Sequence, residues 1–212
     1  LGYLEILKSD PAEPDPMAIE RMFLQARQMH DLLEDLLELA RLENTDTEQS
    51  DDIAEVDIPV LLAQLSEQAE EVSQGQHKIV FKVQPGLNLH GAEADLKSAF
   101  QNLIVNSVNH TPAKGKITVT WQETRDGMEL NVSDTGIGIP NRDIPRLTER
   151  FYRVGDDRNR KTGGTGLGLA IVKHVLQSHN ARLEIKSELG KGSEFRCIFP
   201  LESKAQNPSK TI

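Results

Sequence analysis

The alternating segment Met128-Glu129-Leu130-Asn131-Val132-Ser133-Asp134 runs directly into the turn Thr135-Gly136-Ile137-Gly138-Ile139-Pro140. Alternation with a period of two predicts a strand with one apolar and one polar face, and it places Asp134 on the apolar face. A carboxylate directed at a core needs a hydrogen-bond donor, because burial without one is costly. The two glycines permit positive φ angles and a close approach of the backbone to a ligand.

Two interpretations of Asp134 remain open from these residues. Its carboxylate can accept a hydrogen bond from an exocyclic amine of a ligand, such as the amine of adenine. Alternatively, it can cap its own turn, which is common where an Asp stands two positions before a Gly.

A helix is predicted upstream, at 92–110, with a core-facing stripe followed by a polar face. Asparagine is a poor helix former, so several on one face call for a reason. Carboxamide oxygens are neutral, hard ligands that suit Mg²⁺ together with phosphate oxygens and water. The alternative is a solvated polar surface near the end of the helix. The stripe is Leu96, Ala99, Phe100, Leu103, Ile104 and Ser107, and the polar face is Asn102, Asn106, Asn109 and His110.

Downstream, Gly163-Gly164-Thr165-Gly166-Leu167-Gly168 leads into an apolar helix predicted at 167–178. Free backbone N–H groups at such a helix start can bind phosphate oxygens. The preceding segment is long, basic and without apolar periodicity, which is typical of a mobile lid. It is not a P-loop, because Leu169 stands where that loop has Lys, and no strand precedes it as in a dinucleotide fold.

The rest of the chain adds a helix at 58–73 and strands at 79–83, 117–122, 182–187 and 194–199. Adjacent antiparallel strands with interspersed helices predict an α+β fold, a two-layer α/β sandwich with helices on one face of a mixed sheet. At the N-terminal end, apolar residues from 17 to 43 recur at three- and four-residue steps. This amphipathic helix needs a partner, and we expect a longer helical hairpin that pairs with a second copy.

The expected division of the chain is a truncated dimerisation hairpin at 1–48, a linker at 49–56, a catalytic domain at 57–203 and a tail at 204–212. The 212 residues carry 24 Lys and Arg against 33 Asp and Glu, a net charge of -9 that opposes nucleic acid and anionic membranes. No apolar run is long enough to span a bilayer, and the single Cys197 fits a reducing compartment. A cytoplasmic fragment is expected.

The ordered segments resemble the N, G1, F and G2 boxes of the histidine kinase, gyrase and Hsp90 ATPase superfamily. They are most similar to sensor histidine kinases of the phosphate-regulon type, and the resemblance covers nearly the whole chain. It implies a Bergerat-type ATPase fold, preceded by the truncated helical hairpin of a dimeric four-helix bundle. The boxes correspond to Asn102–Ser107 with His110–Pro112, Asp134–Gly138, Glu149–Val154 and Gly163–His174.

The resemblance also implies ATP and Mg²⁺ as ligands. Asn106 would hold the metal, Asp134 would read the adenine amine, and Gly136 and Gly138 would shape the surroundings of the base. The residues implied to bind ATP are Asn102, Asn106, Asn109, His110, Asp134, Gly136, Gly138, Ile139, Tyr152, Arg153, Arg158, Lys161, Thr165, Gly166, Leu167 and Gly168.

The implied activity is that of a histidine protein kinase, which passes a phosphoryl group to a histidine and then to an aspartate of a response-regulator receiver domain. The intact protein would be a homodimer anchored in the bacterial inner membrane by upstream segments. The family's phosphoacceptor box is absent, so no catalytic residue is assigned and the fragment is expected not to autophosphorylate. Two further departures are Asn109, where the family often has Lys, and Thr148 at an aromatic position, which leaves Phe151 to anchor the F box.

Two alternatives remain. One is a dimerisation or regulatory module that binds nucleotide without transferring it. The other is an ATPase of the gyrase or Hsp90 type, which needs a carboxylate base on the Asn-rich helix. Glu93 and Asp95 lie well before Asn102 and fit that role poorly.

Overall fold

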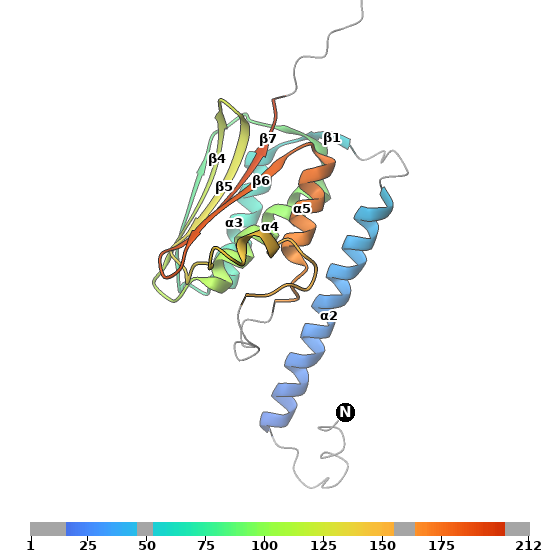
Figure 1. The fold of residues 1–212 in the computed structure, drawn as a ribbon, viewed down its shortest axis with the longest axis vertical. Helices are drawn as coiled ribbons and strands as arrows, with labels where there is room; N and C mark the ends of the chain where they lie inside the picture. Colours follow the sequence, from blue (N-terminus) through green and yellow to red (C-terminus); the bar gives the residue numbers. More distant parts are fainter. Residues whose placement is uncertain (1–15, 46–52, 155–163, 202–212) are drawn as a thin grey trace, which may run out of the picture.

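The computed structural model describes residues 16–45, 53–154 and 164–201, which form a two-layer α/β sandwich with one long helix beside it (Figure 1). The predicted α+β sandwich is therefore confirmed. Its helices and strands are α2 Pro16–Thr45, β1 Ile53–Val56, α3 Ile58–Ser73, β2 Lys78–Val83, β3 Leu89–Ala92, α4 Glu93–His110, β4 Lys116–Thr124, β5 Gly127–Asp134, α5 Gly168–Ser178, β6 Arg182–Glu188 and β7 Gly192–Phe199.

The main sheet has five strands in the order β2-β4-β5-β7-β6. Strand β2 pairs with β4 in parallel, and every other pairing in this sheet is antiparallel. Helices α3, α4 and α5 cover one face of it (Figure 1). Strands β1 and β3 form a separate antiparallel pair. This order puts the end of β5 in the middle of the sheet, beside β7.

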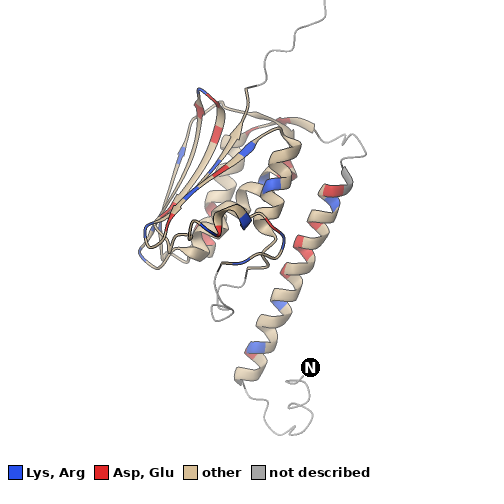
Figure 2. Ribbon diagram, viewed as in Figure 1, with Lys and Arg blue, Asp and Glu red and all other residues tan. Residues whose placement is uncertain are grey.

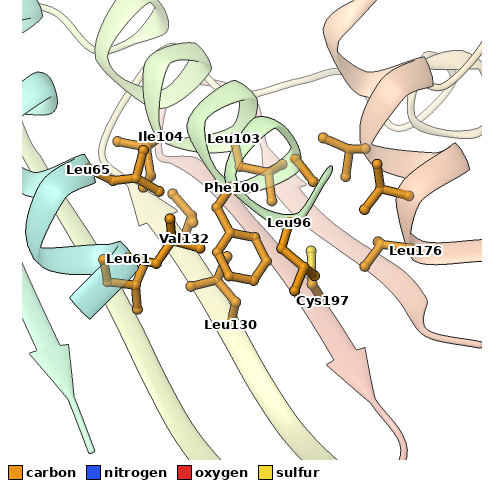
Figure 3. Packing of buried hydrophobic residues seen from close by; sticks show 14 of the residues in the cluster. Leu61, Leu65, Leu96, Phe100, Leu103, Ile104, Leu130, Val132, Leu176 and Cys197 are labelled. Atoms are coloured by element: carbon orange, nitrogen blue, oxygen red, sulfur yellow. The ribbon is translucent and has the colours of Figure 1, made fainter. Parts of the chain in front are cut away.

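The core lies between the sheet and the three helices. Each apolar member of the stripe predicted on α4 is at most 1% exposed, and Ser107 is 3% exposed. Phe100 of this stripe packs against Trp121 and Phe199, with ring centroids 6.4 Å and 6.1 Å away. Figure 3 shows Phe100 among Leu96, Leu103 and residues of the neighbouring strands. The 3.6-residue period thus fixes which face of α4 meets the sheet, and leaves its polar face beside α5 and the turn after β5.

Among the described side chains of α2, the large apolar ones that are buried lie near its C-terminal end. Leu39 and Leu42 are 4% and 3% exposed, where α2 packs against the sandwich. Most of the other large apolar side chains of α2 are exposed, and charged residues of both signs are interspersed among them (Figure 2). No helix in the described ranges combines the length and apolarity that a bilayer crossing needs. The exposed apolar residues of α2 are Met17, Ile19, Phe23, Leu24, Met29, Leu33, Leu36 and Leu37.

Most predicted elements agree with the observed ones to within one or two residues. The small β1–β3 sheet was not predicted. Four residues of the segment expected to be a linker, Ile53–Val56, form β1 and pair with Leu89–Ala92. Thus the ordered sandwich includes the end of that segment. Residues 1–15 of the expected hairpin lie outside the described residues.

Candidate functional site

Asp134 ends β5 in the interior of the sandwich and is only 7% exposed. The N–H groups of Gly136 and Ser193 both donate to its Oδ1 atom, at 2.7 Å and 3.3 Å. Burial raises the pKa of this carboxyl, while the two backbone donors and nearby His110 oppose the rise. The turn-cap interpretation is therefore correct for Oδ1. Because both donors bind the same oxygen, Oδ2 keeps its acceptor capacity for a ligand.

The glycine turn after β5 is tied to two other elements, α4 and β6. Ile137 N–H donates to the carbonyl of His110 at 3.1 Å, and Ile139 N–H donates to Ser187 Oγ at 2.7 Å. Gly138 has a φ of 68°, and a Cβ there would lie 2.1 Å from the carbonyl oxygen of Glu188. Only glycine fits this backbone, so the turn is held in one position beside Asp134.

The C-terminal end of α4 meets this turn through His110. A Cβ at Gly136 would lie 2.4 Å from the His110 carbonyl oxygen, which shows how closely the two backbones approach. The His110 side chain remains accessible, but partial loss of hydration lowers its pKa; the charge of Asp134 raises it and that of Arg153 lowers it. Two predicted site residues, Asp134 and Arg153, therefore lie close enough to a third, His110, for their charges to act on it.

The first turn of α5 faces the same polar side of α4. A Cβ at Gly168 would lie 2.4 Å from Asn102 Oδ1, so these two predicted residues are in direct contact. Leu167 is fully buried and fixes the start of α5, while Thr165 Oγ1 accepts a hydrogen bond from Leu167 N–H at 3.2 Å. Gly166, with a φ of 77°, packs against the backbone of Phe151. The α5 N-terminus is thereby placed beside the Asn-bearing face of α4.

The segment around Phe151 differs from what the sequence suggested. Phe151 was expected to anchor this segment, but its side chain is 57% exposed. The backbone holds it instead, because Phe151 N–H donates to the Gly166 carbonyl at 2.9 Å. Leu147 is the buried apolar residue of the segment, 7% exposed.

Tyr152 has structural partners of its own. Its hydroxyl donates to Asp143 Oδ1 at 2.9 Å, and this bond raises the pKa of the phenol. The guanidinium of Arg146 lies 4.2 Å above the ring. These contacts engage Tyr152 within its own segment, so its expected role at the nucleotide remains a prediction. Arg158 and Lys161 lie outside the described residues.

Asn106 and Asn109 lie on the same polar side of α4, half-buried and exposed respectively. In the described part of the chain, no group of three or more His, Cys, Asp or Glu side chains could hold a metal. The polar face of α4 offers an ion neutral carboxamide oxygens, which ligand phosphates would complement. A half-buried carboxamide one helical turn from Asn102 suits that chemistry.

Sequence reasoning missed two serines of the β6–β7 hairpin. Ser193 pairs with Asp134 across β5 and β7 and is 8% exposed. The hydroxyl of Ser187 contacts that of Ser193 at 3.0 Å. The β6–β7 turn was visible in the sequence, but its register against β5 was not, so no local signal pointed to Ser193.

Comparisons with known proteins agree with this arrangement. Residues 91–203 match the model of the family described as histidine kinase-, DNA gyrase B-, and HSP90-like ATPase. The phosphate regulon sensor protein PhoR of Pseudomonas aeruginosa is 48% identical over 93% of this chain and 45% of its own length. The sensor-like histidine kinase SenX3 of Mycolicibacterium smegmatis is 33% identical over 92% of this chain and 51% of its own length. The chain spans about half the length of these curated relatives.

Solved structures show the same fold. The structure of full-length ShkA in complex with AMPPNP is 31% identical, covers 80% of this chain and 35% of that one, and has a TM-score of 0.68. The histidine kinase AdeS of Acinetobacter baumannii covers 95% of this chain and 92% of its own, with a TM-score of 0.73. At 18% identity, the AdeS likeness concerns the fold alone.

Proposed function

Since the chain belongs to the histidine kinase-, DNA gyrase B- and HSP90-like ATPase family, we propose that it binds ATP with Mg²⁺ as the catalytic region of a sensor histidine kinase. The phosphoryl group would pass to a histidine outside this chain, and then to an aspartate of a response-regulator receiver domain. The intact protein would work as a homodimer joined through the helical hairpin and anchored in the inner membrane by further segments.

The observation that carries the proposal is the state of Asp134. It is a buried carboxylate whose Oδ1 is held by two backbone donors, while Oδ2 retains its acceptor capacity. An ionised acceptor in a fixed, poorly solvated position suits an amine donor such as that of adenine. The glycine turn brings backbone beside it without a side chain in the way.

The phosphates would extend from the adenine toward the start of α5. Its first N–H groups and helix dipole favour anions. Asn102, in contact with Gly168, and His110, beside Arg153, lie along this path. In the proposal Thr165, Gly166, Leu167 and Gly168 surround the phosphates, and Arg158 and Lys161 add positive charge.

Asn106 would hold Mg²⁺ through its carboxamide oxygen, and the bound metal would neutralise phosphate charge during transfer. The chain's own contribution is to position the nucleotide, because phosphoryl transfer depends mostly on alignment and charge. We assign no acceptor histidine within the chain, and no residue of it is proposed to form a covalent intermediate.

A transfer assay in trans tests the kinase proposal. The chain is incubated with radiolabelled ATP, Mg²⁺ and a separate polypeptide that supplies the acceptor-histidine helix of a sensor kinase. We expect acid-labile, base-stable label on that polypeptide and none on this chain. Nucleotide binding without any transfer would favour the alternative, a regulatory module that only binds nucleotide.

An Asn106→Ala variant tests the metal assignment separately. Nucleotide affinity should lose its dependence on Mg²⁺, while affinity in excess chelator stays unchanged. Gln101→Ala is the matched control, because it removes an exposed carboxamide from the same helix. An Mg²⁺ dependence in Asn106→Ala equal to that in Gln101→Ala would exclude Asn106 as the ligand.

A further inference from the structure

The C-terminal half of α2 makes a polar contact with the proposed phosphate site. Thr165 Oγ1 donates a hydrogen bond to Asp35 Oδ2, and the same oxygen of Thr165 accepts from Leu167 N–H at 3.2 Å. Asp35 is thereby attached to a residue just before the first turn of α5. Carboxylates are stabilised at helix N-termini for the same reason as phosphates, because the dipole and free N–H groups favour negative charge.

Further contacts hold α2 in this position. His174 Nε2 on α5 lies 2.9 Å from the carbonyl oxygen of Leu42. Two ion pairs, Arg41 with Asp95 and Glu43 with Arg150, follow along the last turns of α2. With Leu39 and Leu42 buried, this end of α2 forms a continuous docking surface on the sandwich. The Asp35 contact is therefore part of an organised interface.

The surroundings of Asp35 disfavour the ionised form of its carboxyl group. Burial raises the pKa of its carboxyl, the Thr165 hydroxyl opposes that rise, and the neighbouring charge of Asp31 adds to it. A second anion at the same helix start would overlap sterically with this carboxylate and would be repelled by its charge. Thr165 also has one hydroxyl proton, so it can donate to Asp35 or to a phosphate oxygen but not to both.

We infer that Asp35 occupies the anion position at the start of α5, so that docking of α2 and binding of nucleotide phosphates compete for Thr165. The inference rests on the proposed function, because it takes the α5 N-terminus as the phosphate site. The competition is reciprocal. Nucleotide weakens the attachment of α2 to the sandwich, and docked α2 lowers nucleotide affinity. Nucleotide occupancy thus controls whether the sandwich is held against its own helix.

Calorimetric titration of the full chain with a non-hydrolysable ATP analogue and Mg²⁺ tests this inference. Asp35→Asn keeps the shape of the side chain but removes its charge. We expect the variant to bind the analogue about five- to a hundredfold more tightly than wild type, the usual range for coupled sites. Glu34→Gln is the matched control, because it removes one exposed charge from the neighbouring position of α2, and its affinity should equal that of wild type.

Two further measurements test whether the phosphates cause the difference in affinity and whether nucleotide binding releases α2. Adenosine lacks phosphates, so its affinity should be the same in wild type and Asp35→Asn. Hydrogen exchange at the amides of residues 35–43 should accelerate when the ATP analogue binds. Equal analogue affinity in wild type and Asp35→Asn would overturn the competition and leave the proposed function intact. An absence of binding in both proteins would overturn the proposed function as well.

Discussion

At the scale of single residues, Asp134 combines a structural role with a proposed binding role. One carboxylate oxygen closes the turn, through Gly136, and joins β5 to β7, through Ser193. The other is the proposed acceptor for adenine. A neutral amide could perform the first role, since only one acceptor oxygen is needed for both backbone donors. The presence of a buried charge therefore favours a function beyond folding.

Because the two oxygens of Asp134 have separate roles, we expect Asp134→Asn to raise stability and to lower nucleotide affinity. The pKa of Asp134 is raised in the folded state, so the folded chain binds more protons than the unfolded chain between the ordinary value of 3.8 and the raised value. Stability is therefore lost as pH rises through that window. We expect Asp134→Asn to unfold at a higher denaturant concentration than wild type at pH 7.

The advantage should shrink as the pH is lowered, because wild-type Asp134 then becomes neutral too. In the Asp134→Asn variant the outward amide nitrogen would also face the adenine amine, donor against donor, so nucleotide affinity should fall. Urea titrations of both proteins at several pH values measure the difference in stability and its dependence on pH. A variant less stable than wild type at neutral pH would contradict this account of Asp134.

At the scale of elements, the site depends on how the glycine turn packs against the β6–β7 hairpin. Gly138→Ala would add a Cβ 2.1 Å from the Glu188 carbonyl oxygen, at a φ of 68°. Gly86→Ala is a matched control, because its φ is 73° but nothing lies within 4 Å of the added Cβ. Left-handed backbone alone costs about 1 to 2 kcal/mol for a residue with a Cβ.

We expect Gly86→Ala to lose roughly that amount of unfolding free energy and to keep wild-type nucleotide affinity. Gly138→Ala should lose more free energy, because backbone must also move, and should bind nucleotide more weakly. Denaturant titration and calorimetry on both variants measure the two differences. Equal losses would show that the turn is not constrained by the hairpin.

The elements also show what the sequence could and could not predict. Periodicity identified α4 and the placement of Asp134 on the buried side of β5, because both depend on local spacing. Strands β1 and β3 are four residues long and carry too little alternation to be recognised. The roles of Ser193 and Asp35 depend on contacts between distant segments. Such contacts follow from strand register and helix packing, which one sequence does not reveal.

At the scale of the whole molecule, α2 carries more exposed large apolar side chains than any other described element. Phe23 is 65% exposed, and Met29 and Leu37 are each 67% exposed. An exposed apolar face of this length is typical of a helix that packs against others. We propose that a second copy covers it, as in the dimeric helical bundle expected from the sequence.

Sedimentation at increasing protein concentration tests that proposal. Wild type should associate beyond its chain mass of 23.6 kDa, and Leu37→Ser should shift the equilibrium toward the monomer. Leu189→Ser is the matched control, because Leu189 is 66% exposed on the β6–β7 turn, away from α2. Equal association of the two variants would indicate that the α2 face is not the contact surface.

The whole molecule is proposed to act as a nucleotide-binding unit. The most direct test is calorimetric titration of a non-hydrolysable ATP analogue, with and without Mg²⁺, into wild type and Asp134→Ala. We predict Mg²⁺-dependent binding by wild type and an affinity about ten- to a hundredfold lower in the variant, since a charged hydrogen-bond partner is worth roughly 1.5 to 3 kcal/mol. No binding by wild type, or equal binding by a folded Asp134→Ala, would contradict the claim.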